Sequence, residues 1–526
     1  MQISLKMKCI EDLVQNGERE NIEFKEYLTN YHLKENRFQE LACQMNHRII
    51  MGKGRAIYVI GVSDDGKLKG IDEEKFNETV EVLRKIADEI SAKIKSVERF
   101  KVNSGYVGIV EIVKSKAKEH IIVGTAGHVD HGKSTLVGSL ITGKPDDGDG
   151  LTRIYLDTLK HEIERGLSAD LHFAVFGFKD GKPLRMKNPL NKSERAFITE
   201  KADKLVSFVD TVGHEPWLRT TIRGLLGQKI DYGLLVIASN DGVMRTTREH
   251  LGILLAMDLP VIIAITKIDM VSEKRVDEVI GDVSNLLKKV GRVPYIVKDL
   301  GDVKKVAKMM GRSLIVPIIK TSAVTLEGYD LLQELLLRLP VRTFKGKGFL
   351  MYIDRIYRVT GVGTVVSGSV KRGEVEEGEE VYIGPFRDGS FKVVKVQSIE
   401  MHYYRVDKAE AGDIVGIAIK GVRYDELRRG MVLTKEEVKA VKEFEADVYI
   451  FTHPTRIKRG YEPVIHIETI SETVIFKEME KEYMKAGDRG RVRIAFKYNP
   501  QFVYEGQKFI FREGRSKGMG EIIKVY

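Results

Sequence analysis

One nine-residue segment constrains the fold of this 526-residue chain more than any other feature. A short apolar run, residues 121–124, precedes the segment, and a helix-like stretch, residues 135–141, follows it. A strand, a glycine-rich loop and a helix in this order form a phosphate-binding loop, and the pattern G-x-x-x-x-G-K-[ST] is met without a mismatch. We therefore predict a parallel α/β nucleotide-binding domain. The segment reads Gly127-His128-Val129-Asp130-His131-Gly132-Lys133-Ser134-Thr135.

The residue types in this loop suit phosphate chemistry. Gly127 and Gly132 let the backbone curl so that successive N–H groups point at phosphate oxygens, and the following helix adds its positive N-terminal end. Lys133 supplies a fixed positive charge toward the β- and γ-phosphates, and the Ser134 hydroxyl can ligate Mg²⁺. A metal site at the two histidines of the loop is a poor alternative, because no Cys or carboxylate cluster accompanies them. We predict that residues 127–135 bind the phosphates.

A second signal follows the apolar run at residues 205–209. Its residues are Asp210-Thr211-Val212-Gly213-His214. Asp210 at the end of a strand can hold Mg²⁺ through water, Gly213 lets the backbone approach the γ-phosphate, and His214 can orient the attacking water. Taken alone, His214 fits better as a histidine at a helix start that makes a local hydrogen bond. In this context we predict Asp210 as a metal-binding residue, Gly213 as phosphate-binding and His214 as catalytic.

Two further signals predict which base is bound. Thr266-Lys267-Ile268-Asp269 and Thr321-Ser322-Ala323 follow the apolar runs at residues 261–265 and 314–319. The Asp269 carboxylate can accept both N1–H and N2–H of guanine, a donor pair that adenine lacks. The stem of Lys267 can lie on the base, and the second signal can present a backbone N–H to guanine O6. We therefore predict selection of GTP over ATP. The predicted guanine-binding residues are Thr266, Lys267, Asp269, Ser322 and Ala323.

Composition limits the class of protein. The chain has 86 Lys and Arg against 76 Asp and Glu, a net charge of +10 that is dilute over this length but permits nucleic-acid binding. Its two cysteines, Cys9 and Cys43, exclude a disulfide framework and a cysteine-rich zinc site, and fit a reducing cytosol. No apolar run approaches the roughly 18 residues of a membrane span, and residues 1–20 lack the pattern of a signal peptide. We expect a cytoplasmic protein without membrane contact.

The start of the chain predicts a separate α+β module over residues 1–116. Strand-like runs occupy residues 56–62 and 106–113. Between them, residues 73–94 carry apolar side chains at helical spacing. This mixture of patterns differs from that of the remaining chain.

The rest of the chain predicts three more domains, so that the fold class is multidomain α/β plus all-β. Residues 117–342 alternate apolar strands with helical stretches, as in a parallel sheet covered on both faces. The polar stretch at 180–204 is interpreted as a loop or small insertion in this domain. Strand patterns with charged turns then dominate, and predict β-barrels at residues 343–437 and 438–526.

The four signals together resemble those of translational GTPases, in the group of elongation factor Tu and elongation factor 1-alpha. Asp-x-x-Gly-His at residues 210–214 separates this group from Ras-like GTPases, which carry Gln at the histidine position. The resemblance covers roughly residues 118–526. Two later segments resemble the start of the group's second domain and the closing hairpin of its third: Gly361-Val-Gly-Thr-Val-Val-Ser-Gly-Ser-Val370 and Phe511-Arg-Glu-Gly-Arg-Ser-Lys-Gly-Met-Gly520.

Within the group, the chain is most similar to the GTP-binding protein 1 subfamily. The long segment between Gly166 and Asp210 fits that subfamily as well. The residues that carry the resemblance are His161-Glu-Ile-Glu164, Phe176-Gly-Phe178, Gly213-His-Glu215, Arg248-Glu-His-Leu-Gly252 and Thr266-Lys-Ile-Asp269.

Two positions depart from the group. Ser168 stands where the first switch usually has Thr, and Thr266 stands where the guanine motif usually begins with Asn. Serine keeps the hydroxyl that meets Mg²⁺ and the γ-phosphate, and Asp269 keeps the base selection. The resemblance implies GTP and GDP as ligands, with a monovalent cation as an open addition. It also implies Mg²⁺ held by Ser134, Ser168 and, through water, Asp210.

The resemblance also implies partners. In the group, the nucleotide domain and two barrels bind aminoacyl-tRNA, and the ribosome triggers hydrolysis; we expect no DNA partner. Arg489, Arg491 and Arg493 would line one face of a strand, where they either meet RNA phosphates or form a solvated basic face. Two other functions stay open: an RNA-linked adaptor GTPase in mRNA decay or quality control, and a metabolic GTPase subunit like the sulfate-activating one.

Two segments of the N-terminal module resemble the Schlafen/AlbA-type nucleic-acid module. They are Gly17-Glu-Arg-Glu-Asn-Ile-Glu-Phe-Lys25 and Tyr58-Val-Ile-Gly-Val-Ser-Asp-Asp-Gly-Lys-Leu-Lys-Gly70. The clustered carboxylates Glu18, Glu20, Glu23 and Glu26 suggest either a nuclease or an acidic surface beside a structural hairpin. We favour the second alternative, and expect a module that binds nucleic acid or a partner.

Overall fold

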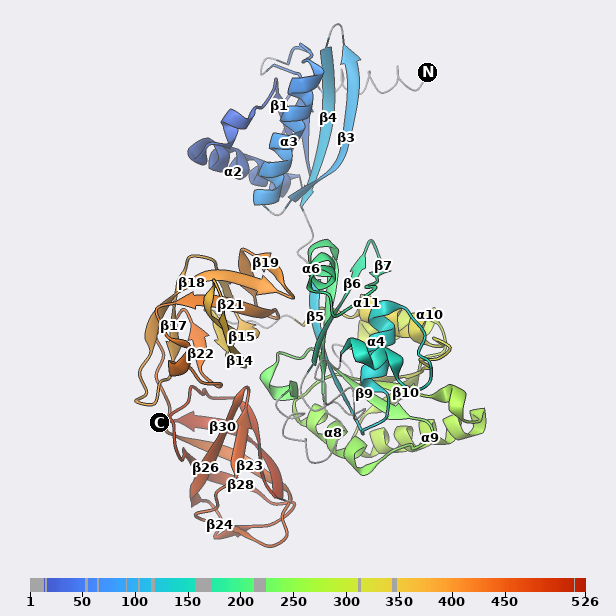
Figure 1. Cartoon of the computed structure of the whole chain (residues 1–526), viewed down its shortest axis with the longest axis vertical. Helices are drawn as coiled ribbons and strands as arrows, with labels where there is room; N and C mark the ends of the chain where they lie inside the picture. Colours follow the sequence, from blue (N-terminus) through green and yellow to red (C-terminus); the bar gives the residue numbers. More distant parts are fainter. Residues whose placement is uncertain are drawn as a thin grey trace. The chain divides into compact units, whose positions relative to one another are not determined.

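A computed structural model of the chain describes residue 14 and residues 17–52, 55–63, 66–90, 92–102, 105–114, 119–156, 172–211, 224–310, 314–342, 348–514 and 516–526. The chain divides into two compact units, Met1–Lys118 and Glu119–Tyr526 (Figure 1). The predicted boundaries after residues 116, 342 and 437 stay predictions. In the described part of the chain, no helix has the length and apolar character that crossing a membrane requires.

The first unit is a four-stranded sheet with two helices packed on one of its faces (Figure 1). The strand order is β1-β2-β4-β3, with β1 parallel to β2 and the other neighbours antiparallel. The helices bury apolar side chains against the face of the sheet that carries Ala56, Tyr58 and Val110. The elements are β1 (Ile22–Lys25), α2 (Glu35–Met51), β2 (Arg55–Ile60), α3 (Glu73–Glu89), β3 (Ala92–Val102) and β4 (Gly105–Lys114).

The helix predicted over residues 73–94 is too long. α3 ends at Glu89, and Ile94 lies in β3, where it pairs with Ile112 of β4. Ile94 happens to continue the helical spacing of Ile86 and Ile90. A β-branched residue satisfies a strand position equally well, and the partner strand that decides between the two is distant in sequence.

The second unit begins with an eight-stranded sheet in the order β11-β12-β10-β9-β5-β8-β6-β7. The strands from β11 to β8 are parallel to their neighbours, and β6 and β7 are antiparallel. The strands are β5 (Glu119–Gly127), β6 (His172–Lys179), β7 (Lys182–Leu184), β8 (Lys204–Asp210), β9 (Tyr232–Ala238), β10 (Val261–Thr266), β11 (Val293–Ile296) and β12 (Ile315–Lys320).

Helices cover both faces of this sheet, as the apolar strands predict. α4 (Lys133–Thr142), α10 (Leu300–Met309) and α11 (Tyr329–Arg338) pack on one face. α8 (Arg245–Ala256) and α9 (Glu273–Lys289) pack on the other. Alternate residues of β10 divide between the two cores, because successive side chains of a strand point to opposite faces.

Of the two interpretations of residues 180–204, a loop or a small insertion, the loop is wrong. This segment contains β7 and the helix α6 (Lys192–Lys201), whose N-cap residue Asn191 accepts a hydrogen bond from the N–H of Ser193. Only Ile198 and Thr199 of α6 are buried. Because so few of its side chains face the core, the helix has almost no apolar periodicity for a sequence to reveal.

The two β-barrels that the sequence predicts are confirmed. In the first, strands follow one another in the order β13-β22-β17-β18-β21-β15, and a pairing of β15 with β13 closes the circle. The second is a closed barrel in the order β23-β28-β26-β25-β29-β30. The first barrel comprises β13 (Leu350–Tyr352), β15 (Gly363–Arg372), β17 (Glu380–Gly384), β18 (Lys392–Met401), β21 (Ile414–Lys420) and β22 (Val432–Thr434). The second comprises β23 (Glu443–Thr452), β25 (Val464–Ile467), β26 (Ile470–Met479), β28 (Arg489–Phe496), β29 (Lys508–Glu513) and β30 (Ser516–Val525).

Candidate nucleotide site

The phosphate loop joins the end of β5 to the start of α4. Gly127 has φ +142°, and a Cβ at this position would lie 2.3 Å from the carbonyl oxygen of Val236 in β9. Gly132 has φ +80° and is the N-cap residue of α4. Both conformations disfavour side chains, so the loop needs glycine at both positions. The loop therefore leads into the N-terminal end of α4, a position where an anion binds well.

Hydrogen bonds from two neighbouring elements support the start of the loop. The N–H of Gly127 donates to Nδ1 of His250 in α8, over 2.9 Å. Nδ1 of His128 contacts the hydroxyl of Thr246, also in α8. Nδ1 of His131 lies 3.3 Å from the carbonyl oxygen of Val236. The first contact holds the loop backbone and the other two hold loop side chains, which is the preorganised arrangement that an electrostatic binding site requires.

The two histidines that support the loop are uncharged at neutral pH. His131 and His250 are both buried, with 0% and 2% exposure. Burial, with the nearby charge of Lys133, lowers the pKa of His131 and of His250 to about 3. These two imidazoles therefore add no positive charge to that of Lys133.

Lys133 and Ser134 lie at the start of α4, as the phosphate-loop pattern predicts. The ammonium group of Lys133 donates to the carbonyl oxygen of His128 over 2.8 Å, so it lies across the loop. The Ser134 hydroxyl donates to one oxygen of Asp210 over 2.6 Å, and the Thr125 hydroxyl donates to the other over 2.5 Å. The structure thus brings Asp210, at the end of β8, to the phosphate loop.

This pair of oxygen ligands fits Mg²⁺. A hydroxyl and a carboxylate are hard oxygen donors, and Mg²⁺ in nucleotide sites takes few protein ligands besides water and phosphate. Asp210 is 1% exposed, so its charge is screened little by solvent. Within the described ranges, no group of three or more His, Cys, Asp or Glu side chains offers a separate metal site.

The predicted base-binding residues lie at the ends of β10 and β12, which are adjacent in the sheet. Lys267 has φ +58°, and its carbonyl oxygen accepts a hydrogen bond from the Ser239 hydroxyl over 2.7 Å. Asp269 is exposed on the short helix Ile268–Met270. The N–H of Ser322 donates to Glu327, so the N–H that can face guanine O6 is that of Ala323. The Asp269 carboxylate and the loop at residues 321–323 are therefore available to contact a base.

Thr266 has a structural contact that the sequence does not predict. Its hydroxyl donates to the carbonyl oxygen of His131 over 2.7 Å, which ties the base motif to the phosphate loop. Sequence reasoning also missed Thr125, Thr246 and His250. The only signal for His250 was the segment Arg248–Gly252, which entered through family resemblance and not through chemistry.

The segment at residues 226–229 joins the nucleotide domain to both barrels. Leu226 packs against Ile510 of the second barrel. The Gln228 side chain donates to Asp354 of the first barrel over 3.2 Å. The N–H of Lys229 donates to Ser369 over 2.9 Å. A movement of this segment would therefore change its contacts with both barrels.

Three predicted site residues lie outside the residues that the structure describes: Ser168, Gly213 and His214. The three arginines predicted on one strand face lie on β28. Arg489 donates to Asp447 over 2.8 Å, and Arg493 donates to Glu443 over 3.1 Å, so acidic neighbours on β23 pair with two of the three.

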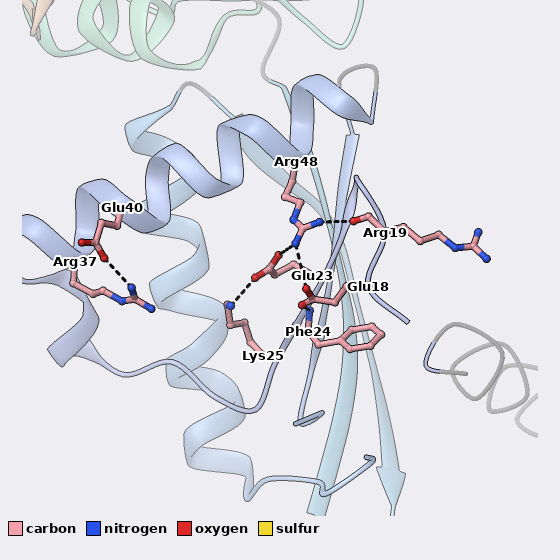
Figure 2. Close-up of polar contacts among 8 residues, drawn as sticks. All are labelled: Glu18, Arg19, Glu23, Phe24, Lys25, Arg37, Glu40 and Arg48. Atoms are coloured by element: carbon pink, nitrogen blue, oxygen red, sulfur yellow. Dashed lines mark hydrogen bonds and ion pairs between the residues drawn. The ribbon is translucent and has the colours of Figure 1, made fainter. Parts of the chain in front are cut away.

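Basic side chains surround the carboxylates of the N-terminal unit. Figure 2 shows Arg48 of α2 between Glu18 and Glu23, with Lys25 on the second carboxylate oxygen of Glu23. The Arg48–Glu18 and Lys25–Glu23 distances are 3.3 and 2.6 Å. Glu26 likewise pairs with Lys69 over 2.7 Å. These ion pairs engage the oxygens that a nuclease would offer to a metal, and favour a structural role.

Family models match most of the chain. The elongation factor Tu GTP binding domain matches residues 118–341, elongation factor Tu domain 2 matches 363–434, and the elongation factor Tu C-terminal domain matches 437–526. A fourth model, Schlafen, AlbA_2, matches residues 18–134. The first three models follow one another in the order of the nucleotide domain and the two barrels.

Curated relatives cover nearly the whole chain. GTP-binding protein 2 of Homo sapiens is 32% identical over 96% of this chain and 87% of its own length. GTP-binding protein 1 of Xenopus laevis is 33% identical over 93% of this chain and 76% of its own length.

A solved structure supports the same fold. The bacterial selenocysteine-specific elongation factor EF-Sec superposes with a TM-score of 0.58 and 24% identity, over 77% of this chain and 58% of that one. The phosphate loop and the two barrels of this chain agree with these matches. The chain therefore belongs to the elongation factor Tu family, and is a GTP-binding, GTP-hydrolysing protein of the translation-factor type.

Proposed function

We propose that the GTP-bound chain binds aminoacyl-tRNA, and that the ribosome activates its hydrolysis of GTP, in translation or translation quality control. The observation that carries this proposal is the contact of residues 226–229 with both barrels, beginning twelve residues after the Asp-x-x-Gly-His segment. A change at the γ-phosphate would reach the barrels through this segment. Such coupling is what a factor needs to bind a large ligand in one nucleotide state only. The process belongs in the cytoplasm, where it meets ribosomes.

The proposed chemistry at the site uses residues with separate roles. Lys133, the loop N–H groups and the N-terminal end of α4 bind and stabilise charge on the phosphates. Ser134, Ser168 and, through water, Asp210 would hold Mg²⁺, which supplies further charge stabilisation when bound. His214 would orient the attacking water. Asp269 would select guanine, with Lys267 and Ala323 completing the base site. A monovalent cation near the phosphates remains an additional proposal.

Binding of aminoacyl-tRNA can be measured directly. The full chain, loaded with GDP or with a non-hydrolysable GTP analogue, is titrated with aminoacylated and deacylated tRNA. We expect the aminoacylated form to bind at least tenfold more tightly to the GTP-state chain than to the GDP-state chain. Equal affinity in the two states, or no preference for the aminoacyl group, would contradict the proposal.

The role of His214 is tested by His214→Ala. If His214 orients water, the variant should keep its affinity for GTP and lose most of the hydrolysis that ribosomes stimulate. Stimulated hydrolysis at the wild-type rate would mean that His214 has no catalytic part.

Ser168→Ala tests the proposed first switch. The variant should discriminate less between GTP and GDP when Mg²⁺ is present, because one ligand specific to the GTP state is gone. Discrimination equal to that of the wild type would place the switch elsewhere.

A second candidate function is an RNA-linked adaptor in mRNA decay or quality control. It is favoured by the match of residues 18–134 to the Schlafen, AlbA_2 model, since the first unit would then bind nucleic acid or a partner. Crosslinking the full chain to RNA and mapping the crosslinked peptides distinguishes the two. Crosslinks confined to residues 17–114 favour the adaptor, and crosslinks in the barrels favour the translation factor.

A further inference from the structure

A chain of polar side chains crosses from the nucleotide domain to the first barrel. Nδ1 of His120 lies 3.0 Å from a carboxylate oxygen of Asp413. Nε2 of His120 and Nε2 of His402 each lie 2.7 Å from the Ser207 hydroxyl oxygen. His120 and Ser207 belong to β5 and β8 of the sheet, whereas His402 and Asp413 belong to the first barrel. This run of hydrogen-bonded side chains therefore exists only while the first barrel is docked on the nucleotide domain.

The donors and acceptors in this chain can be assigned. A carboxylate only accepts, so the Nδ1–H of His120 donates to Asp413. In this assignment Nε2 of His120 accepts the proton of the Ser207 hydroxyl, and the Ser207 oxygen accepts from Nε2–H of His402. Burial, with His120 and Arg195 nearby, lowers the pKa of His402 to about 3, so its ring stays uncharged. Each of the three contacts then joins one donor to one acceptor.

The Asp, His and Ser of this chain have the order of a nucleophilic triad, but they cannot act as one. Ser207 is 0% exposed, on a strand with β5 and β6 on either side. Opening the interface would expose the serine and at the same time remove Asp413, which orients His120. These three residues are buried when they are in contact, and lose their contacts when they become exposed, so they cannot act on a substrate. We therefore assign them a role in docking.

The turn that presents His402 has an unfavourable backbone. β18 ends at Met401 and β19 (Tyr404–Val406) begins three residues later, with Met401 paired to Tyr404. The two residues between them, His402 and Tyr403, have φ +46° and +68°. Such a turn strongly prefers Asn and Gly, because L side chains rarely adopt positive φ. Two large residues in a strained turn indicate that the side chains of His402 and Tyr403 are retained for their contacts.

The helix that the sequence did not predict forms the other side of this contact. α6 packs against β19, and the ammonium group of Lys192 lies 5.0 Å from the centre of the Tyr403 ring. A cation at this distance from an aromatic face is attracted to it. The turn is thus held by Ser207 on one side and by α6 on the other.

We propose that the His402–Tyr403 turn is a latch that docks the first barrel on the nucleotide domain, and that this latch opens and closes during the GTP cycle. Its two partner strands lead directly to the site: β5 ends in the phosphate loop at Gly127, and Ser207 lies three residues before Asp210 on β8. The inference rests on the nucleotide-dependent barrel movement proposed above, and adds the contact that controls it.

Hydrogen–deuterium exchange of the full chain, followed by mass spectrometry of the peptide containing residues 401–404, tests the latch. In the wild type, we expect amide exchange in this turn to differ at least tenfold between the GDP-bound and GTP-analogue-bound chain. His402→Ala should exchange fast in both states. Equal protection of the wild type in both states, or unchanged protection in His402→Ala, would overturn the proposal.

Two further variants separate hydrogen bonding from packing. His402→Gln keeps an N–H close to the position of Nε2 and should restore protection, whereas His402→Leu fills the space without a donor and should behave like Ala. If Leu protects the turn as well as Gln, the hydrogen-bond chain is not the latch. Ser207→Ala should loosen the same peptide, and Ser471→Ala, at an exposed position of the second barrel, should not.

The test is independent of the RNA partner. Melting temperatures of all variants show whether each is folded. Failure of the chain to bind aminoacyl-tRNA would contradict the function proposed above and leave a nucleotide-dependent latch standing. Conversely, a turn that never changes protection would remove the latch without touching tRNA binding.

Discussion

The phosphate end and the base end of the nucleotide site are built in different ways. At the phosphate end, His250 and Thr266 bind backbone groups of the loop, and Thr246 contacts the His128 side chain. At the base end, Asp269 is exposed on a short helix, and its predicted contact with the base is made by its own side chain. We call the phosphate end, residues 127–135 with the contacts that hold them, the cradle. We call the exposed Asp269 side chain the reader. Affinity should therefore depend on the cradle, and base preference on the reader.

The largest effect is expected for Lys133→Ala. Lys133 is 7% exposed, and removing one partner of a buried charge pair costs on the order of 4 kcal/mol, or about a thousandfold in affinity. Fluorescence titration of the nucleotide-free chain with GTP measures the loss. Lys267→Ala, at the base end, is the control and should lose much less. A loss below tenfold in Lys133→Ala would mean that the cradle does not depend on its cation.

Asp269→Asn should change the preferred base and leave the cradle intact. An amide at this position can donate to the O2 of xanthine and no longer accepts two N–H groups of guanine. Two hydrogen bonds to a charged acceptor correspond to about 3 kcal/mol, so the preference should shift about a hundredfold toward xanthosine nucleotides. Competition between GTP and XTP measures the shift. An unchanged preference would remove Asp269 from the base site.

Acidification should weaken the phosphate end through its two buried histidines. The pKa of His131 and of His250 is about 3 in the folded chain, against an ordinary value of 6.5. Between these values the unfolded chain binds more protons than the folded chain. The stability that the neutral histidines contribute is therefore complete above pH 6.5 and is lost as the pH falls below it. From pH 7 to pH 5 the free energy of unfolding should fall by about 2 kcal/mol for each histidine.

Urea unfolding of the wild type and of His250→Asn, followed by circular dichroism at pH 7, 6 and 5, measures this dependence. Asparagine keeps an acceptor near the position of Nδ1 but does not titrate, so the variant should be less sensitive to pH. The same pH dependence in both proteins would mean that His250 is not buried in the neutral form.

The smallest effect is expected for Thr266→Val, which sharpens the comparison most. The hydroxyl of Thr266 contacts the phosphate loop although it belongs to the base motif. Its loss should cost about 1 kcal/mol, or about fivefold, and should weaken GTP and XTP equally. A change in base preference instead would show that Thr266 contacts guanine, as its place in the motif predicts.

Local patterns were sufficient for the parts of the fold that local contacts decide. The strand β10 lies where the apolar run at residues 261–265 places it, and α4 follows the phosphate loop directly. By contrast, α6 has too few buried residues for periodicity, and the end of α3 depends on the pairing of Ile94 with Ile112. Where the partner is distant in sequence, the local pattern does not contain the answer.

The same limit applies to the site. The chemistry of Lys133, Ser134, Asp210 and Asp269 can be read from residue types at fixed spacings. The contact from His250 to Gly127 joins residues far apart in the chain, and no spacing encodes it. The latch at His402 could not be predicted for the same reason, because its contact with Ser207 joins two domains.

The central claim is that a rigid phosphate cradle and an exposed guanine reader form one GTP site. Calorimetric titration of the nucleotide-free full chain with GTP and with ATP, in the presence of Mg²⁺, tests it most directly. We predict that GTP binds at one site per chain and that ATP binds at least a hundredfold more weakly. Equal affinity for the two nucleotides, or no binding of GTP, would contradict the account.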